Sequence, residues 1–310
     1  MVVKGHEESF WFITVISNPM RYKSRIKLYE KFKKHILEEL HSNLLTVELM
    51  LGECDQLVTK KSDDEVLFPT PVTTLVTKQQ ISKNEINVQV RSETVLWHKE
   101  NMLNVAITHL PVNCKYVAWV DADIEFLNRD IIADTVHRLQ MYKVVQMFQN
   151  CIDMGPEGEI MQMHTSFAYC YTNKLPAPWD RKGSARKRQE EDVYNYNINK
   201  RDLINQVYWH CGYAYAMRLE TLNALGGFFD QAILGAGDHH MACCFVGKYD
   251  FSVHVDLHPN YKNAVLAYQE LCNRHIQGRF SYVPGTIKHG FHGWKQNRGY
   301  VSRWEVLKRH

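Results

Sequence analysis

The 310-residue sequence predicts an α/β domain in which helices flank a mainly parallel β-sheet. Its first half alternates short apolar, β-branched runs with segments whose apolar residues recur at helical spacing. Proline, glycine and asparagine separate many of these segments. Acidic residues follow two of the predicted strands, at Asp121 and Asp153. Because ligands of parallel sheets bind beyond the carboxyl ends of the strands, these acids fall on the side expected to be functional.

The elements expected in the first half follow one another in the order of such a sheet. The first strand is rich in aromatic and β-branched residues, and it ends at Asn18 and Pro19. Pro69 and Pro71 interrupt any long element in the segment after the second strand. The expected elements are a strand at 10–17, a helix at 21–40, a strand at 44–51, an irregular segment at 52–84, a short strand at 86–90, a helix from Ser92 as N-cap to Leu110, a strand ending at Val120, a helix at 130–142 and a strand at 143–148.

The second half contains a polar segment between two ordered parts. Residues 179–202 carry a basic block and then an acidic one, which predicts an exposed, mobile loop. After it we expect a strand, a short helix that ends at Gly226 and Gly227, and a helix through Phe245. Asp238 is expected as the N-cap or in the first turn of this last helix. No internal repeat or linker interrupts the chain, so we expect a single domain over 1–310 with the loop as an insertion.

The stretch KYVAWVDADIEF places two acids where an apolar run stops. Asp121 and Asp123 follow a strand that we expect to be buried, and side chains at i and i+2 of a strand point to the same side. A carboxylate near a core strand is costly unless it is paired, hydrogen-bonded or bound to a cation. Two carboxylates at a strand's end suit a divalent cation, which prefers oxygen ligands. The alternative is a turn or helix N-cap that happens to carry two acids.

A late segment adds possible ligands and positive charges. His289, His292, Lys295 and Arg298 lie close together in the sequence, among glycines that permit close approach of the backbone. A lone histidine is usually structural, whereas two histidines followed by a lysine are typical of a cation and phosphate site.

Composition narrows the classes of protein. A formal net charge of +3 and a pI near 8.3 permit an anionic substrate or nucleic acid but require neither. No apolar stretch approaches the roughly 20 residues that span a bilayer, and charges break the amino-terminal segment, so we expect a cytoplasmic protein without membrane contact. The eight cysteines lack CxxC spacing, which argues against zinc and a disulfide framework and favours buried free thiols.

Together these pieces resemble glycosyltransferases of the GT-A fold, in particular soluble family-2-like enzymes of phages, viruses or bacteria. Four segments carry the resemblance in the family's order. FITVISNP with Arg21 and Tyr22 is similar to the nucleotide-binding start, and Asp121-Ala-Asp123 matches the Asp-x-Asp motif. GGFFDQAILGAGDHH resembles the acceptor-side segment, and HGFHGWK resembles the late segment that completes the metal and phosphate site.

The resemblance implies a metal-dependent enzyme that moves a sugar from a nucleotide-diphosphate sugar to a hydroxyl acceptor. It implies a nucleotide-sugar-binding half at 1–150, an acceptor-binding half at 151–310, and Asp238 as the general base. The metal ligands it implies are Asp121, Asp123, His289 and His292. The donor-binding residues it implies are Ser17, Asn18, Arg21, Tyr22, Asn101, Asp121, Lys295 and Arg298.

The expected cofactor and substrates follow from the chemistry of the ligands and from this resemblance. Mn²⁺ is preferred to Mg²⁺ because a histidine joins the oxygen ligands, and a UDP-sugar is the expected donor. Hydroxymethylated bases in phage or viral DNA are one candidate acceptor, to which the basic stretches 181–188 and 295–309 would be suited. A glycan or protein acceptor is the alternative.

Two other functions remain as alternatives. A metal-dependent nucleotidyltransferase also pairs acids around a metal, but no glycine-rich phosphate loop follows the first strand. A nucleic-acid-binding module fits the basic charge, but no such motif is present.

The motifs depart from the commonest family pattern at two points. The third segment has Asp-His where Glu-Asp is commoner, and the fourth has two histidines, so the identities of the base and of the metal-binding histidine stay open.

Overall fold

The structure, a computed structural model, describes residues 9–52, 66–67, 76–94, 96–180, 209–294 and 303–309. Its strands are β1 (Phe10–Ser17), β2 (Asn43–Leu51), β3 (Val66–Leu67), β4 (Val76–Ser82), β5 (Glu85–Ser92), β6 (Tyr116–Val120), β7 (Ile124–Phe126), β8 (Val144–Gln146), β9 (Asn150–Met154), β10 (Ile160–Ser166), β11 (Trp209–His210), β12 (Ala214–Arg218), β13 (Phe280–Tyr282) and β14 (Thr286–His289). Its helices are α1 (Lys23–Lys34), α2 (Lys99–Thr108), α3 (Ile131–Arg138), α4 (Phe167–Thr172), α6 (Leu219–Ala224), α7 (Gly237–Phe245), α8 (Tyr249–Ser252), α9 (Pro259–His275) and α10 (Arg303–Arg309), with a π-helical turn at His35–Glu39 and a 3₁₀ turn at Pro178–Asp180.

The larger of two sheets has the strand order β13-β8-β12-β6-β1-β2-β5-β4-β3. At its centre β6, β1, β2 and β5 pair in parallel. β12 and β4 each pair antiparallel with both of their neighbours, so they alone run against the other described strands of this sheet. The predicted α/β class with a mainly parallel central sheet is therefore confirmed.

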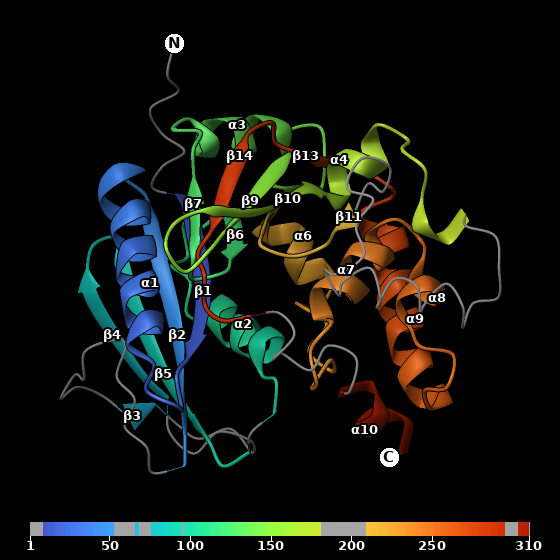
Figure 1. Cartoon of the computed structure of the whole chain (residues 1–310), viewed down its shortest axis with the longest axis horizontal. Coiled ribbons are helices and arrows are strands. Elements are labelled where there is room, and N and C mark those ends of the chain that lie inside the picture. Colours follow the sequence, from blue (N-terminus) through green and yellow to red (C-terminus); the bar gives the residue numbers. More distant parts are fainter. Residues whose placement is uncertain are drawn as a thin grey trace.

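Both faces of the large sheet are covered by helices (Figure 1). Phe10, Phe12 and Ile16 of β1 belong to the core that also contains α1 and α3. Trp11 and Ile13 belong to the opposite core, which contains α2, α6, α7 and α9. A strand buried on both faces is largely apolar, which explains the run FWFITVI of β1, in which Thr14 alone is polar. Burying each such side chain is worth roughly 1.5–3 kcal/mol, so β1 is a central element of stability.

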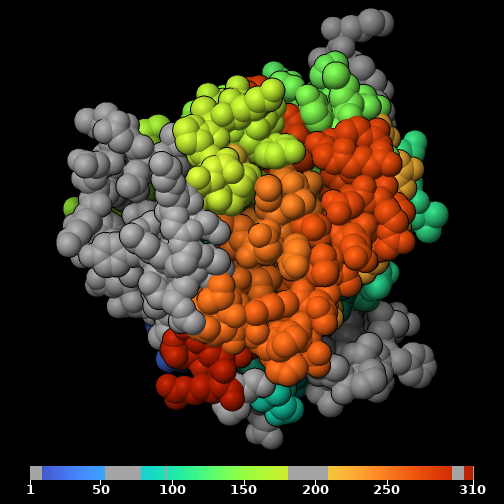
Figure 2. Space-filling model, turned by 90° about the vertical axis from the view of Figure 1, so that its right-hand side faces the viewer, coloured from blue at the N-terminus to red at the C-terminus, as the bar shows by residue number. Residues whose placement is uncertain are grey.

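The helical side of the molecule is dominated by α9. Figure 2 shows α9 and its neighbours in orange, flanked by α4 in yellow-green and α10 in red. α9 has Pro259 in its first turn, where a missing N–H costs nothing, and His258 as N-cap accepts a hydrogen bond from Asn260 N. Val265 and Cys272 point from it into the core.

A smaller sheet lies next to the end of β6 and has the order β11-β10-β9-β14-β7. β14 pairs in parallel with β9 and antiparallel with β7. In this register His289 is opposite Asp153 on one side and Ile124 on the other. The smaller sheet therefore carries the late histidine segment to the acids that follow β6.

The helix expected to begin after Ser92 was placed too early. Ser92 is the last residue of β5, where it pairs with Leu51 of β2, and α2 begins only at Lys99. Strand pairing outweighs the local preference of serine for an N-cap. The helix expected at 21–40 likewise begins at Lys23 and ends in the π-helical turn His35–Glu39. The segment expected to be irregular contains β4, whose pairing with β5 its polar sequence did not indicate.

Two predictions from composition can also be compared with the structure. All seven described cysteines are free, and all but Cys211 are buried, as expected for structural thiols. No helix in the described ranges is long and apolar enough to cross a membrane. The predicted loop at 179–202 lies outside the described residues from position 181 onward.

Candidate metal and active site

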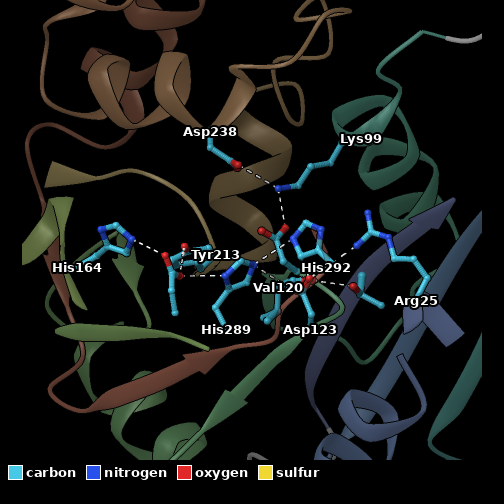
Figure 3. A network of polar contacts seen from close by, with 12 residues as sticks. Arg25, Lys99, Val120, Asp123, His164, Tyr213, Asp238, His289 and His292 are labelled. Carbon is cyan, nitrogen blue, oxygen red and sulfur yellow. Dashed lines mark hydrogen bonds and ion pairs between the residues drawn. The ribbon is translucent and has the colours of Figure 1, made fainter. Parts of the chain in front are cut away.

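Three side chains converge beyond the carboxyl end of β6 (Figure 3). Asp123 follows β6, His289 ends β14, and His292 lies in the segment after β14. His289 Nε2 is 3.7 Å from Asp123 Oδ1, and His292 Nε2 is 3.3 Å from Asp123 Oδ2. The two Nε2 atoms lie 3.3 Å apart. Because one ligand atom from each residue lies within 4.8 Å of the others, the three side chains can share one cation.

Main-chain contacts hold these ligands together. Gly290 N donates a hydrogen bond to Asp123 O over 2.9 Å, and Ile124 N donates to Asp121 O over 3.2 Å. A Cβ on Gly290 would collide with Leu28 and lie 3.4 Å from Asp123 O. A glycine at position 290 is therefore what lets the chain after His289 pass this close to Asp123.

The surroundings of Asp123 fit a divalent cation. The residue is 8% exposed, and its buried Oδ1 accepts no hydrogen bond from the described residues. Arg25 Nη1 lies 3.7 Å from Oδ2. A buried carboxylate oxygen without a donor is costly, and a cation between it and two imidazoles would remove that cost. One oxygen and two nitrogen donors suit Mn²⁺ better than Mg²⁺, which prefers oxygen alone.

A buried carboxylate lies behind His289. Asp153 on β9 is 5% exposed, and its Oδ1 lies 3.0 Å from His289 Nδ1. Tyr213 OH donates to the same oxygen over 2.8 Å. His164 Nε2 lies 2.6 Å from Asp153 Oδ2. In Figure 3 the labelled side chains of His164, Tyr213 and His289 lie in a row that leads from His164 towards Asp123.

Asp121 and Asp238 are joined by a lysine. Lys99 Nζ lies 2.7 Å from Asp121 Oδ1 and 3.0 Å from Asp238 Oδ2. Asp121 therefore contacts Lys99, whereas Asp123 contacts the histidines. The two acids of the motif serve different partners in this structure.

Burial and neighbouring charges shift the titration of Lys99, Glu100 and Asp238. Burial raises the pKa of Asp238, with the Asp121 charge in the same direction, while Lys99 opposes the shift. Burial acts against the Lys99 ammonium, but Asp121, Asp238 and Glu100 outweigh it and raise the pKa of Lys99 well above its usual value. Burial and the charge of Asp238 raise the pKa of Glu100 to about 8. Asp238 is therefore a stronger proton acceptor than a solvent-exposed aspartate.

Asp238 lies in the first turn of α7, as one of the two sequence interpretations expected. The N-cap is Ala236, with a φ of 77°, so Asp238 does not cap the helix. A carboxylate in the first turn is favoured by the helix dipole. A Cβ on Gly212 would lie 3.5 Å from Asp238 Oδ2, so glycine there leaves room beside the carboxylate.

The loop after β1 presents two of the predicted donor-binding side chains. Asn18 is 3% exposed, and its side chain accepts from Tyr22 N over 2.9 Å and donates to Tyr22 O over 3.1 Å. Asn18 therefore shapes the loop. Arg21 adopts a positive φ of 54°, and Tyr22 is 58% exposed. Ser17 Oγ donates to Leu49 O over 3.2 Å, which joins the ends of β1 and β2.

Asn101 lies one turn into α2, beside a small pocket. Its Nδ2 donates to Asp230 Oδ2 over 3.2 Å, and Asn104 donates to the same oxygen over 3.2 Å. The pocket that Asn101 lines is bordered by Leu49, Val90, Ser92, His98, Met102 and Val105. Lys295 and Arg298, the other predicted donor-binding residues, lie outside the described residues.

Lys99 and Arg25 were not among the site residues predicted from the sequence. Arg25 is an ordinary surface residue of an amphipathic helix by its pattern, and only the packing of α1 brings it to Asp123. Lys99 offered no signal in the sequence, because its position as the first residue of α2 became clear only from the structure. A cation there opposes the helix dipole and needs carboxylates nearby to compensate.

No protein-family model and no curated protein matches this chain. Among solved structures, the chain is similar to the mannosyltransferase PcManGT from Pyrobaculum calidifontis in complex with GDP-Man and Mn²⁺, with 14% identity and a TM-score of 0.42 over 97% of this chain and 60% of that chain. It is also similar to S. aureus TarS in complex with UDP-GlcNAc, with 11% identity and a TM-score of 0.39 over 96% of this chain and 64% of that chain.

A third similar structure is the catalytic domain of Drosophila β1,4-galactosyltransferase 7 in complex with xylobiose, with 10% identity and a TM-score of 0.37 over 92% of this chain and 71% of that chain. The chain thus spans less than two thirds of the length of PcManGT and of TarS. TM-scores below 0.5 at such identities do not assign a fold, a substrate or a partner. What they record is a distant similarity to glycosyltransferases over most of this chain's length.

Proposed function

We propose that this protein is a metal-dependent glycosyltransferase that moves a sugar from a nucleotide-diphosphate sugar to a hydroxyl acceptor. The observation that carries the proposal is the convergence of Asp123, His289 and His292 beyond the parallel strands. Asp238 is connected to the motif acid Asp121 through Lys99, which contacts both carboxylates. Ligands of such sheets bind at this edge. The order of the sequence motifs supports the same class of enzyme.

In this proposal the cation is held by Asp123, His289 and His292. When bound, it neutralises the charge that develops on the diphosphate leaving group. Arg25, 3.7 Å from Asp123, adds a second positive charge for the same phosphates. Asp121 then belongs to the donor rather than to the metal, because Lys99 already holds its carboxylate.

Asp238 takes the proton of the acceptor hydroxyl. Burial raises the pKa of this carboxyl, while Lys99 opposes the rise and so favours the ionised form that a base requires. Gly212 leaves room beside Asp238 for the acceptor.

The donor nucleotide and the acceptor are proposed from the sequence. We favour a UDP-sugar as donor and Mn²⁺ as the ion, since nitrogen ligands are poor for Mg²⁺. The acceptor proposed first is a hydroxymethylated base in duplex DNA, supported by the basic stretches 181–188 and 295–309. A glycan or protein hydroxyl is the alternative.

A thermal-shift screen with nucleoside diphosphates tests the class of enzyme. Ligands that bind only the folded protein raise its melting temperature. We expect UDP with Mn²⁺ to give the largest rise, uridine with Mn²⁺ to give little, and EDTA to abolish the effect of UDP. If no nucleoside diphosphate raises the melting temperature in the presence of Mn²⁺, the proposed function is wrong.

Transfer to the acceptor needs a second assay. Labelled sugar should move from the donor to duplexes that contain hydroxymethylated bases and not to unmodified duplexes of the same sequence. Transfer to oligosaccharides or to a protein instead would replace DNA as the acceptor and would leave the enzyme class unchanged.

A further inference from the structure

The buried cluster around Asp153 lies behind the metal site, and apart from His289 it contains no residue that the proposed reaction uses directly. Asp153, His164, Tyr213 and His289 are each at most 8% exposed. They come from β9, β10, the segment before β12 and the end of β14, so four separate elements meet at one carboxylate. Ordering so many polar groups in a core is costly unless their hydrogen bonds are fixed.

The positions of the hydrogen atoms in this cluster follow from its chemistry. An ionised carboxylate only accepts hydrogen bonds, so each group that contacts Asp153 must donate. Tyr213 OH does so over 2.8 Å, and His289 Nδ1 lies 3.0 Å from the same oxygen. His164 Nε2 lies 2.6 Å from the other oxygen. His289 therefore carries its proton on Nδ1, and His164 carries its proton on Nε2.

The second ring nitrogen of His289, Nε2, is the atom that faces the metal site. A neutral imidazole with a proton on Nδ1 has a lone pair on Nε2. That atom faces Asp123 Oδ1 at 3.7 Å and His292 Nε2 at 3.3 Å. In the opposite tautomer, two lone pairs would face each other between His289 and Asp153 in a buried place, which is strongly unfavourable.

We propose that Asp153 is a positioning residue that fixes the tautomer and ring orientation of His289, so that Nε2 is set to bind the divalent cation before the cation arrives. The inference rests on the metal site of the proposed function. Outer carboxylates of this kind make a histidine a better ligand and hold its ring in place. Ladder pairing of β14 with β9 places His289 opposite Asp153, so the contact is set by the sheet register.

The positions of the protons also distinguish His289 from His292 as metal ligands. With no ion between them, two ring nitrogens 3.3 Å apart must share a proton, so His292 Nε2 is the donor to the bare His289 Nε2. His292 must therefore release or move that proton before it can bind a cation through Nε2. His289 is the preset ligand and His292 follows.

The first test reads the tautomers in the metal-free parent protein. Long-range proton–nitrogen correlation spectra at alkaline pH, where imidazoles are neutral, distinguish protonated from bare ring nitrogens, and His289→Gln assigns the signals. We expect His289 protonated on Nδ1 and bare on Nε2, and His164 the reverse. A proton on His289 Nε2 would overturn the inference, and this result does not depend on any variant folding.

The second test measures Mn²⁺ binding. Asp153→Asn keeps the shape of the side chain but removes its charge, and we expect an affinity for Mn²⁺ about 10–100-fold weaker, the usual cost of losing such a partner. Tyr213→Phe is the matched control, because it removes a donor to the same oxygen and leaves the Asp153 charge and the ring that lies over His289. The control should bind Mn²⁺ nearly as the parent does.

The results distinguish this inference from the proposed function. If the parent binds Mn²⁺ and Asp153→Asn binds it equally well, the positioning role is wrong while the metal site stands. If the parent binds no Mn²⁺, the proposed function is wrong, and the tautomers still decide whether Asp153 sets His289. Melting temperatures of the metal-free proteins separate a loss of affinity from a loss of folding.

Discussion

Lys99 Nζ lies 3.0 Å from Asp238 Oδ2, so the proposed base is paired with a cation that belongs to another helix. The same ammonium lies 2.7 Å from Asp121 Oδ1. One lysine therefore links Asp238 to the first acid of the Asp-Ala-Asp motif. It also favours the ionised form of Asp238, because it acts against the rise in the pKa of Asp238 that burial causes.

Lys99→Gln is expected to shift the pH dependence of transfer. Without the lysine, the pKa of Asp238 rises further, so the carboxyl stays protonated to a higher pH. The acidic limb of the kcat/KM profile therefore shifts to higher pH. Lys99→Arg keeps the positive charge and should stay closer to the parent. A Lys99→Gln profile that coincides with the parent's would show that Lys99 does not tune the base.

Asp238→Asn should lower transfer by roughly a hundredfold or more, the usual scale for a lost general base. The melting temperature should change little, because burial already disfavours the charge of Asp238 and Ala236, not Asp238, is the N-cap. Donor binding should be retained. Transfer by the variant at nearly the parent's rate, or a product with retained anomeric configuration, would remove the base role from Asp238.

Glu100→Gln is expected to flatten part of the dependence of stability on pH. Burial, with the charge of Asp238, raises the pKa of Glu100 from 4.5 to about 8, so the folded protein holds a proton that the unfolded chain releases. The stability from this proton is fully present below 4.5 and is lost as pH rises through about 8. Relative to the parent, the melting temperature of Glu100→Gln should therefore rise between about pH 5 and about pH 9. A constant difference across that range would contradict the shift.

His289→Ala is expected to weaken Mn²⁺ binding more than His292→Ala. The His289 side chain is 7% exposed and contacts Asp153 through Nδ1, whereas the His292 side chain is 18% exposed. A ligand fixed in advance loses less freedom on binding than a mobile one. Isothermal titration of both variants measures the difference, and a larger loss for His292→Ala would reverse the ranking.

Much of the fold followed from local patterns. β1, β2 and β6 are buried on both faces, so their sequences are mainly apolar runs that can be recognised without a structure, although Thr14, Thr46 and Glu48 are buried among them. β4 could not be recognised in this way, because its residues VTKQQIS are mostly polar and its position depends on pairing with β5. The start of α2 was missed for a related reason, since pairing with Leu51 keeps Ser92 in the sheet.

The metal ligands of the candidate site could be predicted from the sequence, but the contacts between its side chains could not. Asp123, His289 and His292 were expected as ligands, and the structure brings all three together. Asp121 was expected beside them because of the two-residue spacing of a strand, but the chain turns after Val120, and the two carboxylates find different partners. Contacts between distant elements, such as Lys99 with Asp238, leave no periodic trace in a sequence.

Mn²⁺ binding by the parent, Asp123→Asn and Asp121→Asn, followed by electron paramagnetic resonance of the free ion without nucleotide, tests the metal site most directly. Asp123→Asn should lose binding, because Asp123 contacts both histidines. Asp121→Asn should keep it, because Asp121 pairs with Lys99, and should weaken only donor binding. Undiminished Mn²⁺ binding by Asp123→Asn would contradict a cation held by Asp123, His289 and His292, and so would an equal loss in both variants.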